Sequence, residues 1–168
     1  MSQKLKLRRM PKQFLLDFMK NNSFIDENLY REIVRGMPIF CVDVVITNNN
    51  KFLLGLRKNK PAKGQWYVIG GRVFKNEKLK EAVARKVEEE AGLIIKSIRF
   101  LTISENFFKE SAFGVPTHTV NGVFVAETSS SAFRLPKYSD LSELKWFTSV
   151  DKNMPSYVKE MVKLAYFG

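Results

Sequence analysis

The sequence predicts an α/β (α+β) fold in which helices form layers on a mixed β-sheet. Apolar, β-branched runs predict six strands, one long amphipathic helix lies between the third and the fourth, and another helix follows the last strand. With 168 residues, 45% hydrophobic and 27% charged, the chain is long enough for one compact core and too short for two ordinary domains. We therefore expect a single domain at 23–168, preceded by an extension.

The extension, residues 1–22, is basic and partly apolar, with a short helix expected after Pro11. Its basic start is typical of a secretory signal, but Asp17 and Lys20 interrupt the apolar stretch and no small-residue cleavage site follows. No apolar run approaches the roughly 20 residues of a membrane helix. We expect a cytoplasmic protein, whose extension packs on the domain, assists dimerisation or covers an edge.

The first elements of the domain are a helix at 26–35 and a hairpin. Asp26 is the expected N-cap, and the apolar face of this helix is expected to comprise Leu29, Ile33 and Val34. The hairpin is predicted from the runs PIFCVDVVI and KFLLGLR on either side of an NNN turn. The single cysteine, Cys41, excludes an internal disulfide and a cysteine-based metal cluster, so we expect a buried structural thiol.

The central helix is predicted at 78–91, after the short buried strand WYVIGG, and Gly92 is its expected left-handed cap. Apolar residues at helical spacing predict a core-facing side formed by Leu79, Ala82, Val83 and Val87. The remaining elements are expected as strands near 94–106, 117–127 and 143–148 and a helix near 155–166.

The net charge of +11 raises the question of nucleic-acid binding. The lysines are dispersed, however, and the only basic cluster is KLKLRR in the extension. No recognition-helix, zinc-finger or RNA-binding signature is present. We therefore expect small anionic substrates and no nucleic-acid partner.

Three consecutive carboxylates, Glu88, Glu89 and Glu90, lie near the end of the central helix, where they repel one another and oppose the macrodipole. Helical spacing brings Arg85 to Glu89, and Lys86 to both Glu89 and Glu90. An acidic run of this kind is usually a solvated face. Here two glycines precede the helix, and a close-approaching loop could add carbonyl ligands for Mg²⁺, which would neutralise a pyrophosphate.

The segment GGRVFKNEKLKEAVARKVEEEAGL resembles the Nudix box, G-x(5)-E-x(7)-R-E-U-x-E-E-x-G-U with U aliphatic. Its fixed positions are filled by Gly71, Glu77, Arg85, Val87, Glu89, Glu90, Gly92 and Leu93. The one departure is Lys86, where the family usually has a glutamate that binds metal or acts as base. The resemblance implies a Nudix fold, an α/β/α sandwich around a mixed β-sheet, and dependence on Mg²⁺ or Mn²⁺.

Similarity to the GDP-mannose mannosyl hydrolase branch of this family covers most of residues 25–148. It is carried by Pro38 to Asp43, by FLLGLRKNKPAKGQWYVIGGRV and by LKWF at 144–147. That branch implies a homodimer that cleaves the sugar–phosphate C–O bond of GDP-mannose or GDP-glucose. Its box also lacks the glutamate that Lys86 replaces.

The resemblance implies three sets of site residues. The expected metal ligands are Gly70, Glu89, Glu90 and Asp140. The expected substrate contacts are Asp43, Arg57, Arg72 and Thr119. The expected catalytic residues are Arg57, Arg72, Glu89 and Asp140. Guanidinium groups suit this chemistry because negative charge develops on the departing diphosphate.

The general base is open. The branch uses a histidine in the loop before the tryptophan, whereas LPKYSDLSELKW has none, so Asp140 or Glu143 could contribute a carboxylate. The only histidine, His118, is more often a structural residue than a base at such a position.

Three functions remain open from the sequence. A Lys86 ammonium paired with Glu89 or Glu90 would occupy the space of a second Mg²⁺, which favours glycosyl C–O cleavage of a small-molecule nucleotide-sugar. The three glutamates could instead support a nucleotide-sugar or ADP-ribose pyrophosphatase. Loss of the box glutamate and the loop histidine would also suit a catalytically silent, nucleotide-binding module.

Overall fold

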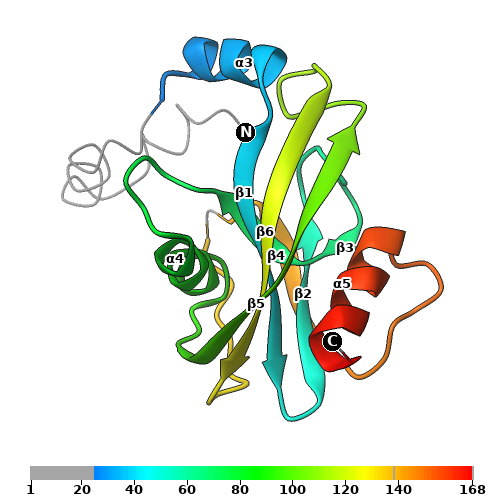
Figure 1. Ribbon diagram of the computed structural model, residues 1–168. Helices are drawn as coiled ribbons and strands as arrows, with labels where there is room; N and C mark the ends of the chain where they lie inside the picture. Colours follow the sequence, from blue (N-terminus) through cyan, green and yellow to red (C-terminus); the bar gives the residue numbers. More distant parts are fainter. Residues whose placement is uncertain (1–24, 138, 168) are drawn as a thin grey trace.

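The computed structural model describes residues 25–137 and 139–167, and the predictions for residues 1–22 lie outside that part of the chain. A seven-stranded mixed sheet forms the middle layer. Figure 1 shows α4 (Leu79–Ala91) on one face of this sheet, α5 (Ser156–Phe167) on the other and α3 (Glu27–Gly36) across one end. The predicted α/β/α sandwich around a mixed sheet is therefore confirmed.

The strands lie close to their predicted positions. They are β1 (Ile39–Asn48), β2 (Lys51–Arg57), β3 (Trp66–Tyr67), β4 (Ile69–Arg72), β5 (Ile95–Phe108), β6 (Thr117–Thr128) and β7 (Leu141–Phe147). β1 runs parallel to β6, β6 pairs antiparallel with β5, and β7 pairs antiparallel with β2.

The prediction of one strand at WYVIGG was wrong, because the chain there forms two short strands. β1 and β2 pair only beside their turn, where Ile46 to Asn48 face Lys51 to Leu53. Farther from the turn, β3 pairs with β2 and β4 pairs with β1. The segment crosses from one strand of the hairpin to the other at Val68, and this fork holds the two glycines of β4.

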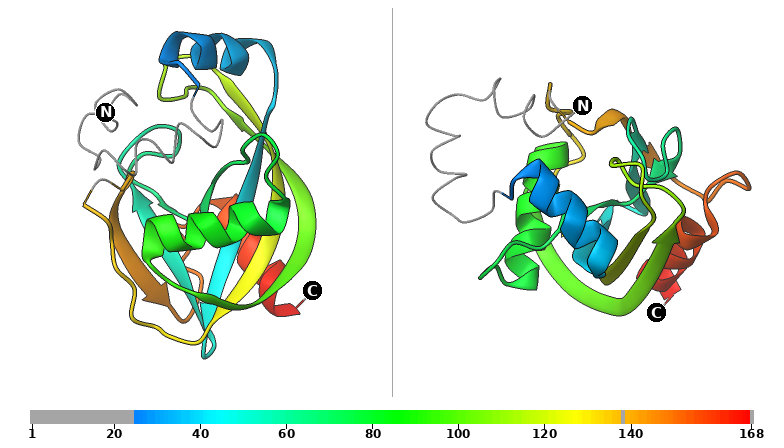
Figure 2. Two further views of the ribbon diagram at one scale, coloured as in Figure 1. Left: turned by 90° about the vertical axis from the view of Figure 1, so that its left-hand side faces the viewer. Right: turned by 90° about the horizontal axis from the view of Figure 1, so that it is seen from above.

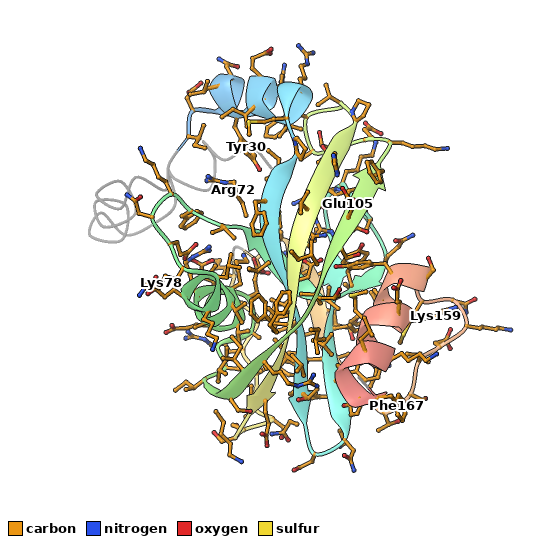
Figure 3. The ribbon with its side chains drawn as sticks, in the orientation of Figure 1. Tyr30, Arg72, Lys78, Glu105, Lys159 and Phe167 are labelled. Atoms are coloured by element: carbon orange, nitrogen blue, oxygen red, sulfur yellow. The ribbon has the colours of Figure 1, made fainter. Side chains whose placement is uncertain are left out.

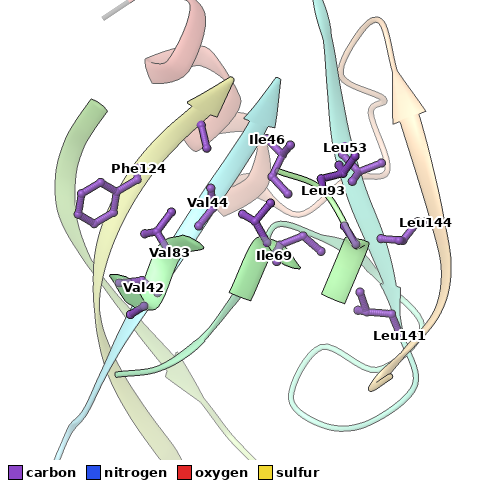
Figure 4. Packing of buried hydrophobic residues seen from close by; sticks show 14 residues of the cluster. Val42, Val44, Ile46, Leu53, Ile69, Val83, Leu93, Phe124, Leu141 and Leu144 are labelled. Carbon is purple, nitrogen blue, oxygen red and sulfur yellow. The ribbon is translucent and has the colours of Figure 1, made fainter. Parts of the chain in front are cut away.

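The core consists of two clusters on opposite faces of the sheet, because successive strand residues alternate in direction. Val42 and Val44 pack with Val83 of α4, as Figure 4 shows, whereas Val45 packs with Val158 of α5. The predicted core face of α4 is confirmed: Ala82, Val83 and Val87 are fully buried and Leu79 is partly buried. Gly92 has the expected left-handed conformation, with φ of 63°.

Helix α3 begins as predicted, since the Asp26 carboxylate accepts a hydrogen bond from the Asn28 N–H at 2.9 Å. The prediction of its apolar face was wrong at Leu29, which is 58% exposed. The side turned to the domain carries Val34, which is buried, and Tyr30, whose ring meets Phe113 edge-on at 5.5 Å. The two views of Figure 2 show α3 at one end of the strands, where it is in contact with β6.

Among the helices that the structure describes, none combines the length and the apolar character needed to cross a membrane.

Candidate active site

The Lys86 side chain lies between α4 and the fork at β4. A Cβ atom at position 71 would lie 3.0 Å from Lys86 Cε, so Gly71 makes room for the passing side chain. Its Nζ lies 2.8 Å from Glu90 Oε1 and 3.5 Å from Glu89 Oε2. Both predicted pairings are confirmed, and the Lys86 side chain is only 12% exposed.

Glu90 uses its second oxygen as well, because the Ser139 hydroxyl donates to Oε2 at 2.8 Å. Burial alone would raise the pKa of Glu90, and the nearby Asp140 carboxylate acts in the same direction. The Lys86 ammonium and the Ser139 hydroxyl outweigh both and hold the pKa of Glu90 below its usual range. Glu90 is therefore a carboxylate at neutral pH, with a resident cation beside it.

Asp140 is held in the loop that precedes β7. Its Oδ1 accepts a hydrogen bond from Asn59 Nδ2 at 2.9 Å, and its carbonyl accepts one from the Lys58 N–H at 2.9 Å. These bonds attach the loop before β7 to the loop after β2. The other carboxylate candidate, Glu143, is an exposed residue of β7 opposite Leu56.

Glu89 is engaged by two cations. Its Oε2 accepts from Arg85 Nη1 at 3.2 Å and also lies near Lys86. Arg85 in turn forms two hydrogen bonds to Glu77, at 2.6 and 2.9 Å, and donates to the Arg72 carbonyl at 3.1 Å. Arg85 therefore ties α4 to the loop after β4.

Asp43 lies on the α5 face of the sheet, directly against β4. Tyr157 of α5 donates a hydrogen bond to its Oδ2 at 2.5 Å. A Cβ at position 70 would lie 2.1 Å from its Oδ1, so only glycine fits there. Burial raises the pKa of Asp43 to about 6, although the Tyr157 hydrogen bond and the positive charge of Arg57 oppose the rise.

The two arginines expected to contact substrate lie at the ends of β2 and β4, and Arg57 is close enough for its charge to act on Asp43. Arg57 Nε donates to the Pro61 carbonyl at 2.7 Å, which anchors the side chain at the end of β2. Arg72, the last residue of β4, pairs across the strands with Cys41. Thr119 lies on β6 opposite Ile39, and same-face alternation places it on the side of the sheet that carries Asp43.

Two other predictions concern His118 and Cys41. His118 stacks on Phe107, with ring centroids 4.3 Å apart, and its Nε2 lies 3.1 Å from Glu105 Oε1. These contacts place His118 on the β5–β6 hairpin, with Glu105 and Phe107, rather than beside Lys86 or Asp43. Cys41 was expected as a buried structural thiol and is only partly buried, although desolvation raises its pKa to about 12.

The structure brings several of the predicted residues into two groups, while Arg72 and Thr119 belong to neither. Around Lys86 lie Glu89, Glu90 and, next to Ser139, Asp140. Around Asp43 lie Arg57, the unpredicted Tyr157 and Gly70, which was expected among the metal ligands. The fork at β4 separates the two groups, with Gly70 touching the second and Gly71 touching the first.

The donor chemistry fits one divalent cation. Across residues 25–137 and 139–167, no three His, Cys, Asp or Glu side chains gather as a metal site. Glu90 and Asp140 are close enough for the charge of one to act on the other, and carboxylate oxygens are the ligands that Mg²⁺ prefers. Since Lys86 supplies one positive charge there already, the group suits a single ion that displaces its ammonium.

A mixed sheet between helices, with a glutamate-rich helix after a two-glycine strand, is a fold shared with MutT-type hydrolases. The crystal structure of a MutT NUDIX hydrolase from Burkholderia pseudomallei matches with a TM-score of 0.65 at 25% identity, over 76% of this chain and 98% of that one. The sequence signature of the NUDIX domain matches residues 37–162. The chain therefore belongs to the Nudix family.

Two curated relatives are similar to parts of this chain. The low-salt glycan biosynthesis protein Agl8 of Haloferax volcanii is 39% identical over 92 residues, which is 55% of this chain and 59% of that protein. The ADP-ribose pyrophosphatase of Methanocaldococcus jannaschii is 48% identical over 59 residues, 35% of each chain. The matched parts thus span less than two thirds of either relative.

Several residues of the site were not predicted from the sequence. Ser139 and Asn59 hold Glu90 and Asp140, but single polar residues in loops carry no signal of their partners. Tyr157 is 114 positions from Asp43 along the chain, and its helix was predicted only as a packing element. Only covariation between positions 43 and 157 in related chains could have indicated Tyr157 from sequence.

Proposed function

We propose that this protein hydrolyses a nucleoside diphosphate sugar of the GDP-mannose type, releasing the free sugar and the nucleoside diphosphate. The observation that carries the proposal is the 2.8 Å pair between Lys86 Nζ and Glu90 Oε1. It supports a one-cation site, whereas enzymes that cleave the phosphoanhydride commonly use several ions to activate water. The glycan-biosynthesis relative supports a sugar substrate, because glycans are built from activated sugars.

In this reaction a water oxygen bonds to the anomeric carbon, and the bond from that carbon to the phosphate oxygen breaks. The nucleoside diphosphate leaves with the bonding electrons, and one proton passes from the water to a carboxylate base, for which Asp140 is the candidate. Arg57 and Arg72 stabilise the charge that develops on the departing diphosphate. Asp43 and Thr119 lie on the same face of the sheet and are assigned to substrate contacts.

Nudix hydrolases generally use divalent ions such as Mg²⁺ or Mn²⁺. In this chain Glu90, Asp140 and the Gly70 carbonyl would hold the ion, with Glu89 adjacent. Bound there, it would neutralise negative charge on the diphosphate. The role of Lys86 is then to neutralise the negative charge of Glu90 whenever the ion is absent.

The decisive experiment incubates the purified chain with GDP-mannose and Mg²⁺ in ¹⁸O-labelled water. The proposal expects mannose and GDP as products, with the label in the sugar. Mannose phosphate and GMP, with the label on phosphorus, would identify a pyrophosphatase, the alternative favoured by the 48% identity to the ADP-ribose enzyme. ADP-ribose is therefore included as a second substrate.

A catalytically silent binding module is the third possibility. It is supported if no nucleotide-sugar is turned over while nucleotides still raise the melting temperature.

Glu90→Gln tests the assignment of the metal ligand. We expect metal-dependent turnover to fall by at least about a hundredfold, because the substitution removes a charged oxygen ligand. Glu88→Gln is the matched control, since Glu88 is an exposed neighbour on the same helix and lies outside both groups of site residues. Equal activity of the Glu90→Gln and Glu88→Gln variants would remove Glu90 from the site.

A further inference from the structure

The Arg72 guanidinium lies near two aromatic rings. Its Cζ is 5.3 Å from the centroid of Tyr30 and 5.1 Å from that of Phe74. Figure 3 shows Tyr30 and Arg72 close together beneath α3. A cation within about 6 Å of a ring centroid is attracted by the ring quadrupole. Helix α3 therefore contributes to holding an arginine that the proposed function directs at the diphosphate.

The second ring continues the arrangement towards α4. The Phe74 ring also contacts Arg85, whose Cζ lies 3.8 Å from the ring centroid. Arg85 is fixed by Glu77 and donates to the Arg72 carbonyl. The series Tyr30, Arg72, Phe74 and Arg85 forms a cation–ring ladder from α3 to α4, firmly anchored at its α4 end.

The α3 end of the ladder is anchored as well. Phe113 of the β5–β6 loop meets the Tyr30 ring at an interplanar angle of 82°, and Val34 buries the next turn of the helix. Helix α3 ends at Gly36, immediately before the residues that match the NUDIX domain, 37–162. Tyr30 therefore lies outside the part of the chain that the family signature covers.

We infer that Tyr30 is a positioning residue for nucleoside diphosphate binding, which fixes the plane of the Arg72 guanidinium by stacking on its face. Ring contacts use the face of a guanidinium, whereas its N–H groups donate from the edge, so both kinds of contact are compatible. The inference rests on the proposed function, which assigns Arg72 to the diphosphate. Tyr30 would strengthen binding of the diphosphate through Arg72, so its effect on affinity should be the same for every nucleobase.

The test measures binding of GDP, ADP and UDP, with Mg²⁺, to the full chain by calorimetry. We expect Tyr30→Ala to weaken binding about threefold to thirtyfold, the range of a cation–ring contact from exposed to desolvated. Tyr30→Phe keeps the ring and should bind like the unmutated chain. Leu29→Ala is the matched control, because Leu29 is the exposed neighbour on the same helix.

A double-mutant cycle with Arg72→Gln separates positioning from simple support of the fold. If Tyr30 acts through Arg72, Tyr30→Ala has no further effect on binding once Arg72 is replaced. The same loss in both backgrounds, or no loss in either, overturns the inference. Tyr30→Leu guards against unfolding, since it keeps apolar packing on Phe113; it should retain the melting temperature and still bind as weakly as Tyr30→Ala.

The outcomes also separate this inference from the function on which it rests. An unmutated chain that binds none of the three diphosphates and turns over no nucleotide-sugar overturns both. An unmutated chain that binds or turns over nucleotides while Tyr30→Ala matches it overturns the role of Tyr30 alone.

Discussion

Asp43 is the residue at which stability and activity are expected to conflict. The residue is 8% exposed, and burial raises the pKa of its carboxyl from an ordinary value of 3.8 to about 6. Between these two pH values the folded state binds more protons than the unfolded state, so stability falls as pH rises through this window. Above pH 6 the full cost of a buried charge is present.

Asp43→Asn should therefore stabilise the protein at pH 8 by about 1 to 3 kcal/mol, because the amide is uncharged and its oxygen can still accept from Tyr157. At pH 4 the gain should be absent, since Asp43 is then protonated in the folded state. Urea denaturation at pH 4, 6 and 8 measures the difference. A gain that is equal at all three pH values would mean that the charge of Asp43 is not its cause.

The fork between β1 and β2 requires that residue 70 has no side chain. A Cβ there would lie 2.1 Å from Asp43 Oδ1 and 2.6 Å from the Val42 carbonyl oxygen. Gly70→Ala should therefore destabilise the fold by about 2 to 4 kcal/mol, because a strand must shift to admit one methyl group.

Gly36→Ala is the control for this substitution, since a Cβ at the end of α3 meets no atom within 4 Å. Its effect should stay within about 0.5 kcal/mol. Chemical denaturation of both variants gives the comparison, and similar stabilities would show that the fork tolerates a side chain.

Periodicity predicted most of the elements. Ala82, Val83 and Val87 at helical spacing indicated α4 and its buried face, and alternating or continuous apolar runs indicated β1 and β2. Leu29 shows the limit of the pattern, because α3 lies across the end of the sheet and packing there, not hydrophobicity alone, decides which side is covered. The break at Val68 was equally hidden, since it depends on which partner strand each half of WYVIGG meets.

The candidate site was predictable where contacts are local. The pairs of Lys86 with Glu89 and Glu90 follow from helical spacing, and the structure contains both. The bond of Tyr157 to Asp43 and that of Ser139 to Glu90 join distant parts of the chain. Such contacts depend on the complete arrangement of layers, which no local spacing encodes.

The whole molecule carries a net charge of +11, which should attract an anionic substrate before contact. We expect kcat/KM for a nucleotide-sugar to fall severalfold between about 0.05 and 0.5 M NaCl, because salt shortens the range of the attraction. Steady-state assays at constant pH test this, with sucrose-matched viscosity as the control. A rate independent of salt would mean that the overall charge plays no part in capture.

The homodimer that the resemblance implies stays a prediction. Sedimentation equilibrium of the full chain should give twice the monomer mass of 19.4 kDa. A single species at the monomer mass would contradict it.

The ammonium of Lys86 has a consequence for the life of the protein in a cell. Because Lys86 already neutralises Glu90 on α4, we expect the polypeptide to fold without magnesium. If turnover depends on Mg²⁺ as proposed, loss of the ion would silence the protein reversibly, and restoring the ion would recover the same molecules without new synthesis.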